Sequence, residues 1–183
     1  MKRYIYLFIV LIFFCWTSCQ NEKVSEQLTK VDHLMNRLDS IESTLTKTDT
    51  IAAKANIKTV GELLGYIQKN YHDTMTKQTG FLMSDFHGSR KSFKRLLENY
   101  HKEYKELKYT RNQLDDLRKD VTNEILNDTT FNSYFIAEKN AVDRLYESVQ
   151  NLSVWEASSK KYFQQRYLPV RELVEKMKAE EEE

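Results

Sequence analysis

The amino-acid sequence predicts an all-α protein made of two antiparallel helical hairpins that form an elongated four-helix bundle. Apolar residues recur at steps of three and four residues, which is the period of an amphipathic helix. Charged residues make up 30% of the 183 residues, as is typical of long helices with solvated outer faces. Four glycines and one proline are too few for the many tight turns of a β-rich protein.

The first predicted hairpin lies in residues 19–76, and its two arms carry matching apolar stripes. The stripes are Val24, Leu28, Val31, Met35 and Leu38 in one arm, and Ile57, Val60, Leu64, Ile67 and Tyr71 in the other. When two helices fold back on each other, the numbers of facing residues have a nearly constant sum, and these residues form five pairs that each sum to 95. The chain is therefore expected to turn at Lys47–Thr48, with Asp49 capping the second helix.

The second predicted hairpin lies in residues 89–168 and has longer arms. Its predicted facing pairs, each with a sum of 256, are Ile125 with Phe131, Val121 with Phe135, Leu114 with Val142, Leu107 with Val149, Phe93 with Phe163 and, among polar residues, Arg118 with Glu138 and Tyr100 with Glu156. This register places the turn at Asp128, and Thr129 or Thr130 is predicted to cap the next helix.

Residues 77–88 are predicted to connect the two hairpins, with breaks at Gly80 and Gly88. The apolar residues of this stretch, expected to cover one end of the core, are Phe81, Leu82, Met83 and Phe86. Pro169 is expected to end or kink the fourth helix and to leave residues 169–183 as a short terminal helix with an acidic tail. The hairpins are expected to pack side by side, and an end-to-end arrangement is the alternative.

Residues 1–18 have the layout of a secretory signal peptide. Lys2 and Arg3 give a basic start, and the run from Tyr4 to Trp16 carries no charge. This run is shorter than the roughly 20 apolar residues that a membrane-spanning helix needs. The sequence therefore predicts an exported protein without a permanent transmembrane helix at this end.

Trp16, Thr17, Ser18 and Cys19 form a segment that resembles the lipobox of bacterial lipoproteins, with Trp16 standing where an aliphatic residue is usual. The resemblance implies that the thiol of Cys19 is acylated and that Cys19 becomes the first residue of the mature chain. It also implies a bacterial envelope protein, held in a membrane through the acyl chains on Cys19. Gln20 at the next position, in place of Asp, implies the outer membrane.

An ordinary signal peptide that contains cysteines is the alternative to a lipobox. It would leave Cys19 as an unpaired thiol in an oxidising compartment, because the only other cysteine, Cys15, lies inside the signal segment. Without residues 1–18 the chain has 26 basic and 27 acidic residues, since that segment holds two basic residues and no acidic one. A net charge of −1 argues against nucleic acid as a partner.

Three groups of polar residues are candidates for a catalytic or metal site. Glu98 and His101 form one Glu-x-x-His element, but di-iron bundles need two, and a solvated helix face is the simpler interpretation. The pairs His72–Asp73 and Asp85–His87 invite a general-base role. The motifs of serine hydrolases, zinc proteases and phosphate-binding loops are absent from the sequence. The sequence therefore predicts a non-enzyme without a cofactor or metal.

Arg90, Lys91, Lys94 and Arg95 form a basic cluster at the predicted start of the third helix. Cations at that end oppose the helix dipole, so the cluster is a candidate contact for phosphate or carboxylate groups, with a solvated charged face as the alternative. The predicted function is a lipid-anchored helical scaffold or adaptor for another envelope protein. The alternative is a small-ligand or glycan binder that uses residues 76–101 and Trp155.

Overall fold

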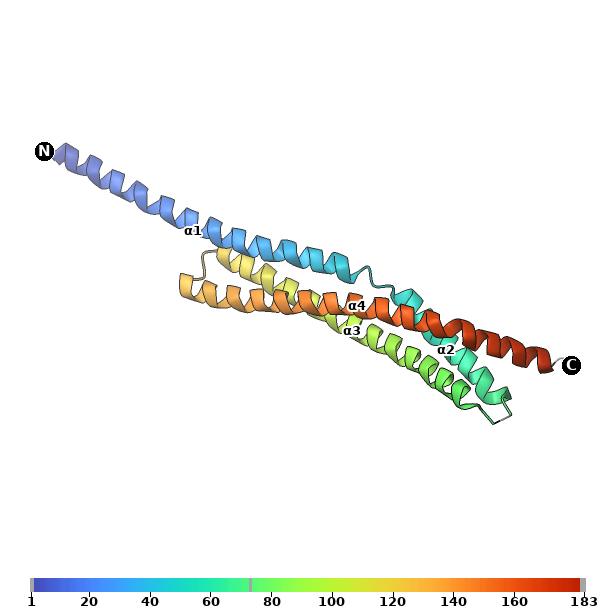
Figure 1. The fold of residues 1–183 in the computed structure, drawn as a ribbon. Coiled ribbons are helices and arrows are strands. Elements are labelled where there is room, and N and C mark those ends of the chain that lie inside the picture. Colours follow the sequence, from blue (N-terminus) through green and yellow to red (C-terminus); the bar gives the residue numbers. More distant parts are fainter. Residues whose placement is uncertain (1, 73, 182–183) are drawn as a thin grey trace. The chain divides into compact units, whose positions relative to one another are not determined.

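The structure, a computed structural model, describes the backbone of residues 2–72 and 74–181 and the side chains of residues 22–72 and 74–181. Over this part of the chain it contains four α-helices and no strand (Figure 1). The helices are α1 (Lys2–Leu45), α2 (Thr50–Asn70), α3 (Lys77–Thr122) and α4 (Asp128–Glu181). The all-α prediction is confirmed. The predicted signal segment 1–18 and Cys19 lie outside the described side chains.

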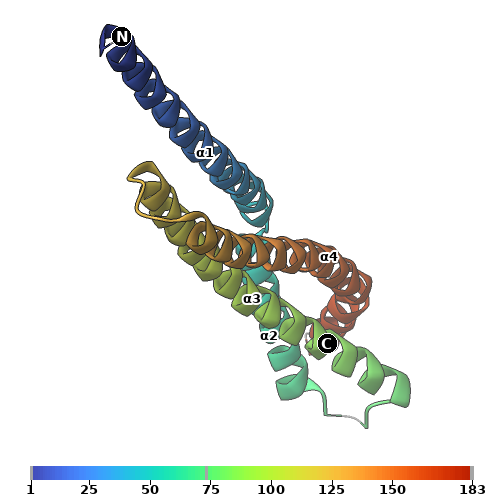
Figure 2. The ribbon, with the colours of Figure 1, turned by 90° about the vertical axis from the view of Figure 1, so that its left-hand side faces the viewer.

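The chain divides into two compact units, each containing parts of several helices. Unit 1 consists of Met1–Glu42 and Glu106–Tyr146, so it holds α1 with the end of α3 and the start of α4. Unit 2 consists of Ser43–Lys105 and Glu147–Glu183, so it holds α2 with the start of α3 and the rest of α4. Figure 2 shows the short connection that joins α3 to α4.

In unit 1, the ion pairs between helices show how α1 runs against its neighbours. The residue numbers of the pairs Asp32–Arg118 and Asp39–Arg111 both sum to 150, so α1 is antiparallel to α3. The pair Lys23–Asp128 indicates that the start of α1's described part lies beside the start of α4, as a parallel pair requires. The core of this unit is Val31, Leu34, Leu38, Ile41, Leu107, Leu114, Leu117, Val121, Phe131, Val142 and Leu145.

In unit 2, α2 runs antiparallel to α3 and parallel to α4, as α1 does in unit 1. The backbone N–H of Asp49 donates to Glu156, and Tyr66 near the end of α2 donates to Glu181 near the end of α4, so these two helices are parallel. Ser92 and Ser159 are hydrogen-bonded at 2.7 Å, and this antiparallel contact joins α3 to α4. The core of this unit is Leu45, Ala53, Val60, Ile67, Phe86, Phe93, Leu96, Val149, Leu152, Phe163, Val170, Val174 and Met177.

The predicted first hairpin is not present in either unit. α1 packs in unit 1 and α2 packs in unit 2, each with a segment of α3 and a segment of α4. The periodicity of both stripes was correct, because Val31, Leu38, Val60 and Ile67 are buried. Equal periodicity does not specify a partner, however, and the α3 and α4 stripes offer apolar surface to either arm.

The predicted antiparallel pairing of residues 89–168 is present, with a shifted register. Phe93 and Phe163 make the expected contact, with ring centroids 5.8 Å apart. The pairs Ser92–Ser159 and Asp85–Arg166 each sum to 251 rather than 256. The reason is that the turn lies between Thr122 and Asp128 and is centred near residue 125, because Asp128 already belongs to α4.

The two polar pairs expected from the earlier register are absent. Arg118 binds Asp32 of α1 at 2.8 Å instead of meeting Glu138. Glu156 accepts from the backbone of Asp49 and pairs with Lys160 instead of facing Tyr100. Arg118 and Glu156 thus make their described contacts with residues other than their predicted partners. Ile125 is also not packed on Phe131, because its side chain is 66% exposed in the turn.

The helix caps confirm one prediction and correct another. Asp49 caps α2, and its carboxylate accepts from the backbone N–H of Ala52 at 2.8 Å. At the start of α4 the cap is Asn127, whose side-chain oxygen accepts from the backbone N–H of Thr130 at 2.9 Å. The prediction of Thr129 or Thr130 as the cap was wrong, because the helix begins earlier than the predicted turn allowed.

The predicted connector at 77–88 is helical and forms the first turns of α3. Phe86 is fully buried, which ties this stretch to the core, whereas Phe81 is exposed and does not cover the core as expected. Gly80 and Gly88 lie inside the helix, where a glycine costs about 1 kcal/mol without stopping it. The connection between α2 and α3 is therefore shorter than predicted.

Pro169 does not end the fourth helix, because α4 continues through it to Glu181. An interior proline costs a helix about 3 kcal/mol. Val170, Val174 and Met177 are buried beyond it, and burying one such side chain contributes about 1.5–3 kcal/mol. Packing therefore outweighs the local cost, and the predicted separate helix at 169–183 is wrong.

Candidate functional site

The basic cluster of Arg90, Lys91, Lys94 and Arg95 lies well inside α3, since that helix begins at Lys77. The expectation that these cations stand at a helix start was therefore wrong, and the dipole argument for an anion contact does not apply. Lys91, Lys94 and Arg95 are exposed. Arg90 is half-buried and turns toward α2.

Arg90 packs its guanidinium against Gly61 of α2. Its Cζ lies 3.7 Å from the position that a Cβ on Gly61 would occupy, which is an ordinary van der Waals distance. The Arg90 Nε is buried and has no hydrogen-bond partner among the described residues. The structure thus separates one packed arginine from three solvated cations, and it does not bring the four into a single site.

Trp155 on α4 faces α3 through a short polar chain. Its indole Nε1–H donates to Ser92 Oγ at 3.1 Å, and Ser92 is hydrogen-bonded in turn to Ser159 at 2.7 Å. Ser159 is buried, and Trp155 is half-buried. This hydrogen bond directs the indole N–H of Trp155 toward α3, and part of the residue stays exposed.

A hollow of about 190 Å³ opens beside Trp155, between α3 and α4 of unit 2. It is lined by Asn99, Lys102, Glu103, Ser148, Asn151, Leu152 and Trp155. Leu152 is buried and supplies an apolar surface, while the amide, hydroxyl and carboxylate groups supply polar ones. The lining thus combines one aromatic and one aliphatic side chain with five polar or charged ones.

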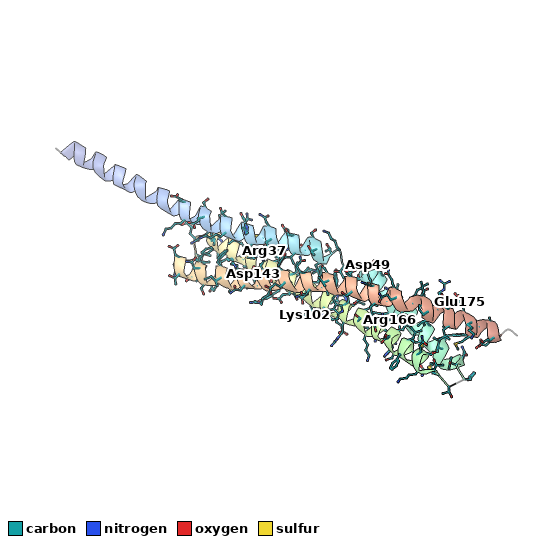
Figure 3. All side chains as sticks on the ribbon, viewed as in Figure 1. Arg37, Asp49, Lys102, Asp143, Arg166 and Glu175 are labelled. Atoms are coloured by element: carbon teal, nitrogen blue, oxygen red, sulfur yellow. The ribbon has the colours of Figure 1, made fainter. Side chains whose placement is uncertain are left out.

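Glu103 is the most unusual member of this lining. The residue is only 6% exposed, yet it carries a carboxylate. Its ion-pair partner is the neighbouring Lys102, whose Nζ lies 3.6 Å from Glu103 Oε1 and whose side chain is 77% exposed. That distance is too long for a hydrogen bond. Figure 3 labels Lys102 on α3 beside this region.

Glu103 was not predicted as a site residue, although the sequence holds a signal for it. The α3 core stripe runs in steps of three and four through Phe93, Leu96, Tyr100, Glu103, Leu107, Thr110 and Leu114. A carboxylate at a core position of such a stripe is costly unless another group binds it. The hollow itself depends on side chains from two helices and could not be predicted from that stripe.

The other predicted candidates are His72, Asp73, Asp85, His87, Glu98 and His101. His72, His87, Glu98 and His101 are exposed, and Asp85 pairs with Arg166 at 3.3 Å. Asp73 lies outside the described residues, and Cys19 lies outside the described side chains. Within the described side chains, no group of three or more potential metal ligands gathers at one point.

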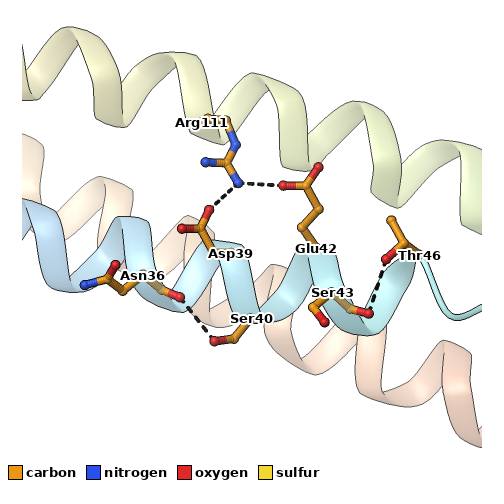
Figure 4. A network of polar contacts seen from close by, with 7 residues as sticks. All are labelled: Asn36, Asp39, Ser40, Glu42, Ser43, Thr46 and Arg111. Carbon is orange, nitrogen blue, oxygen red and sulfur yellow. Dashed lines mark hydrogen bonds and ion pairs between the residues drawn. The ribbon is translucent and has the colours of Figure 1, made fainter.

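Unit 1 has its own network of charges, but these groups bind one another. Arg111 of α3 donates to Asp39 and Glu42 of α1, each at 2.7 Å (Figure 4). The hydrogen bond to Asp39 is the main cause that raises the pKa of Arg111. The Asp143 carboxylate is bound by Lys139 and by Arg37, and these contacts lower its pKa. The charged groups of this network pair with one another, and the pairs of Arg111 and Arg37 join different helices.

Comparison of the chain with protein-family models, with curated proteins and with solved structures gives no match in any of the three. In the residues whose side chains are described, no helix is long and apolar enough to cross a membrane.

Proposed function

We propose that the chain is a non-enzymatic, lipid-anchored helical adaptor of the bacterial envelope, tethered through Cys19 and binding another envelope protein with the surface of unit 2. The tether rests on the resemblance of residues 16–19 to a lipobox. On this proposal the acyl chains bring the adaptor to the outer membrane, and the helices present the contact surface to the partner.

The observation that carries the proposal is a pair of large apolar side chains on the outer surface of α4. Val154 is 67% exposed and Leu168 is 57% exposed. They are separated by two heptads, so they lie on the same face of the helix. A partner that covers this face would bury both apolar side chains, and buried apolar side chains are typical of the core of a protein interface.

In-cell photo-crosslinking tests this proposal. A photoreactive residue replaces Val154 in the full chain, and a matched variant carries it at the exposed Glu62 of α2. We expect one envelope protein to be captured from Val154 and not from Glu62, and to be lost when Cys19→Ser removes the tether. Equal labelling from both positions, or no captured protein, would contradict the proposal.

A small-ligand or glycan binder is the second candidate, and the polar lining of the hollow beside Trp155 is the observation in its favour. Asn99, Asn151 and Ser148 offer both donors and acceptors, as sugar hydroxyls require. A ligand that binds only the native state raises the unfolding temperature. A thermal-shift screen of envelope saccharides tests this candidate, which would be abandoned if no saccharide stabilises the full chain.

A further inference from the structure

The hollow beside Trp155 contains a carboxylate, that of Glu103, whose ion pair among the described residues is long. Glu103 is 6% exposed, and among the described residues its partner is Lys102 at 3.6 Å, beyond hydrogen-bonding distance. A buried carboxylate normally accepts several hydrogen bonds or meets a close cation, because its desolvation is otherwise uncompensated. The carboxylate of Glu103 can therefore accept hydrogen bonds from a donor that enters the hollow.

The other lining groups define which donor would fit. Trp155 presents part of its ring to the hollow, and a cation over an indole face is attracted by the ring. The side-chain carbonyls of Asn99 and Asn151 can accept N–H groups. A planar cation with several N–H donors would use the carboxylate, the ring and the amides together, and a guanidinium has this geometry.

The volume of the hollow favours an amino-acid side chain over a free small-molecule ligand as its occupant. Pockets for small molecules usually measure about 300–1,000 Å³. This hollow measures about 190 Å³, which suits the end of one long side chain. We propose that it receives an arginine side chain of the partner protein, bound by Glu103 and stacked on Trp155. This inference rests on the adaptor function proposed above and names the chemistry of its contact.

Lys102 stands at the rim of the hollow and competes with the incoming arginine. Its side chain is 77% exposed, so its pairing with Glu103 contributes little stability and is easily given up. A lysine ammonium would also lack the paired donors that match a carboxylate. Removal of Lys102 is therefore expected to strengthen binding of an arginine side chain.

Tryptophan fluorescence of the full chain tests the inference. Trp16→Phe leaves Trp155 as the single tryptophan, and N-acetyl-arginine amide serves as the probe. We expect a saturable change in emission with a dissociation constant of about 1–10 mM, as is reasonable for one side chain. The uncharged citrulline analogue should give no saturable change at the same ionic strength.

Three variants and one matched control locate the binding. Glu103→Gln should weaken it tenfold or more, while the matched control Glu98→Gln, exposed on the same helix, should leave it unchanged. Lys102→Met should strengthen it several-fold. If circular dichroism shows that Glu103→Gln is unfolded, Asn151→Leu at the exposed rim narrows the hollow and should weaken binding at least fivefold.

Binding that is unaffected by Glu103→Gln in a folded protein, binding of citrulline equal to that of arginine, or no saturable change up to 100 mM would overturn the inference. The crosslinking assay separates it from the adaptor proposal. A partner captured from Val154 equally well with and without Glu103→Gln would refute the arginine contact and leave the adaptor function in place. A partner lost with Glu103→Gln would support both.

Discussion

Glu138 on α4 is a half-buried carboxylate, and burial raises its pKa above the ordinary value of 4.5. Among the described residues no cation pairs with it, because Arg118 binds Asp32 of α1 instead. A carboxylic acid whose pKa is raised by folding holds its proton more tightly in the folded state. Its ionised form therefore destabilises the fold at neutral pH, and this penalty disappears as the pH falls below the unfolded-state pKa.

Glu138→Gln is therefore expected to increase the free energy of unfolding at pH 7 and to leave it unchanged at pH 3. Urea denaturation at the two pH values measures this difference. The exposed Glu98→Gln provides the control and should change stability by less than about 0.5 kcal/mol at pH 7. A loss of stability in Glu138→Gln at pH 7 would show that the carboxylate has a binding partner.

Glu124 ends α3 in a conformation that favours glycine. Its φ is 55°, and the backbone N–H groups of Glu124 and Ile125 donate to the carbonyls of Val121 and Asp120. These two hydrogen bonds are those of a Schellman motif, in which glycine is the usual residue at this position. A side chain in the left-handed region costs roughly 1 kcal/mol.

Glu124→Gly is expected to stabilise the protein by about 0.5–1 kcal/mol, because it removes this backbone strain. Asn123→Gly, one residue earlier, should instead cost up to about 1 kcal/mol, because the N–H of Asn123 still bonds to Lys119 as in a helix. Thermal unfolding of the two variants measures the contrast. Equal changes in stability, of the same sign in both variants, would contradict the assignment of Glu124 to the left-handed position of the Schellman motif.

The start of α4 depends on one side chain, Asn127. It accepts from both the backbone N–H and the hydroxyl of Thr130. Asn127→Ala is expected to lower the free energy of unfolding by about 0.5–2 kcal/mol, the usual cost of a lost N-cap. Thr129→Ala, at an exposed position of the first turn, should be neutral within about 0.5 kcal/mol. Chemical denaturation measures both, and a larger effect of Thr129→Ala would place the cap elsewhere.

The two glycines of α2 provide a matched test of its packing on α3. A Cβ on Gly65 would meet nothing within 4 Å, whereas one on Gly61 would touch the guanidinium of Arg90. Gly65→Leu is expected to stabilise the protein by about 0.5–1 kcal/mol through helix propensity. The free energy of unfolding of Gly61→Leu should be about 1 kcal/mol lower than that of Gly65→Leu, because the larger side chain displaces Arg90. Differential scanning calorimetry compares the two, and equal values would show that Arg90 is not held against Gly61.

α3 and α4 each contribute to both units, while α1 and α2 supply the remaining helix of unit 1 and unit 2. Removing residues 1–72 would therefore expose the core stripe of the hairpin formed by residues 77–181. Helices are stabilised mainly by burial of such a stripe and only weakly by local propensity. The two units are thus expected to depend on α1 and α2 for folding.

The fragment 77–181 is predicted to lose most of its helix or to aggregate, as measured by circular dichroism and sedimentation. Addition of the peptide 20–72 should restore helical signal at equimolar ratio, because it supplies the apolar faces that α1 and α2 bury. A fragment 77–181 that is monomeric and unfolds cooperatively without the peptide would contradict this dependence.

Much of the fold follows from features that a linear sequence displays. The apolar stripes around Val31, Val60 and Phe93 indicate helices because a 3.6-residue period places such residues on one face. The cap at Asp49 is equally local, since its carboxylate binds a backbone N–H three residues later. The errors at Pro169 and at 77–88 have the opposite origin, because burial of residues such as Val170 and Phe86 overrides a weak local signal.

The residues of the candidate site also divide into those that the sequence indicates and those that only the tertiary structure reveals. Trp155 and residues up to 101 could be proposed from the sequence, but Glu103 could be recognised only as a charge in an apolar stripe. The hollow exists because the register of α3 against α4 brings Glu103 near Ser148 and Trp155. That register is set by the turn near residue 125, where Glu124 adopts a conformation that its residue type does not signal.

Helix content, the positions of the apolar stripes and the lipobox-like segment can thus be obtained from the chain alone, because each depends on residues only a few positions apart. The pairing of α1 and α2 with α3 and α4, the register of α3 against α4 and the burial of Glu103 cannot. Those features depend on which apolar faces pack together, and stripes of equal period can replace one another in such packing. The choice among them is made by tertiary contacts, such as those of Arg118, Arg111 and Glu156 with residues of other helices.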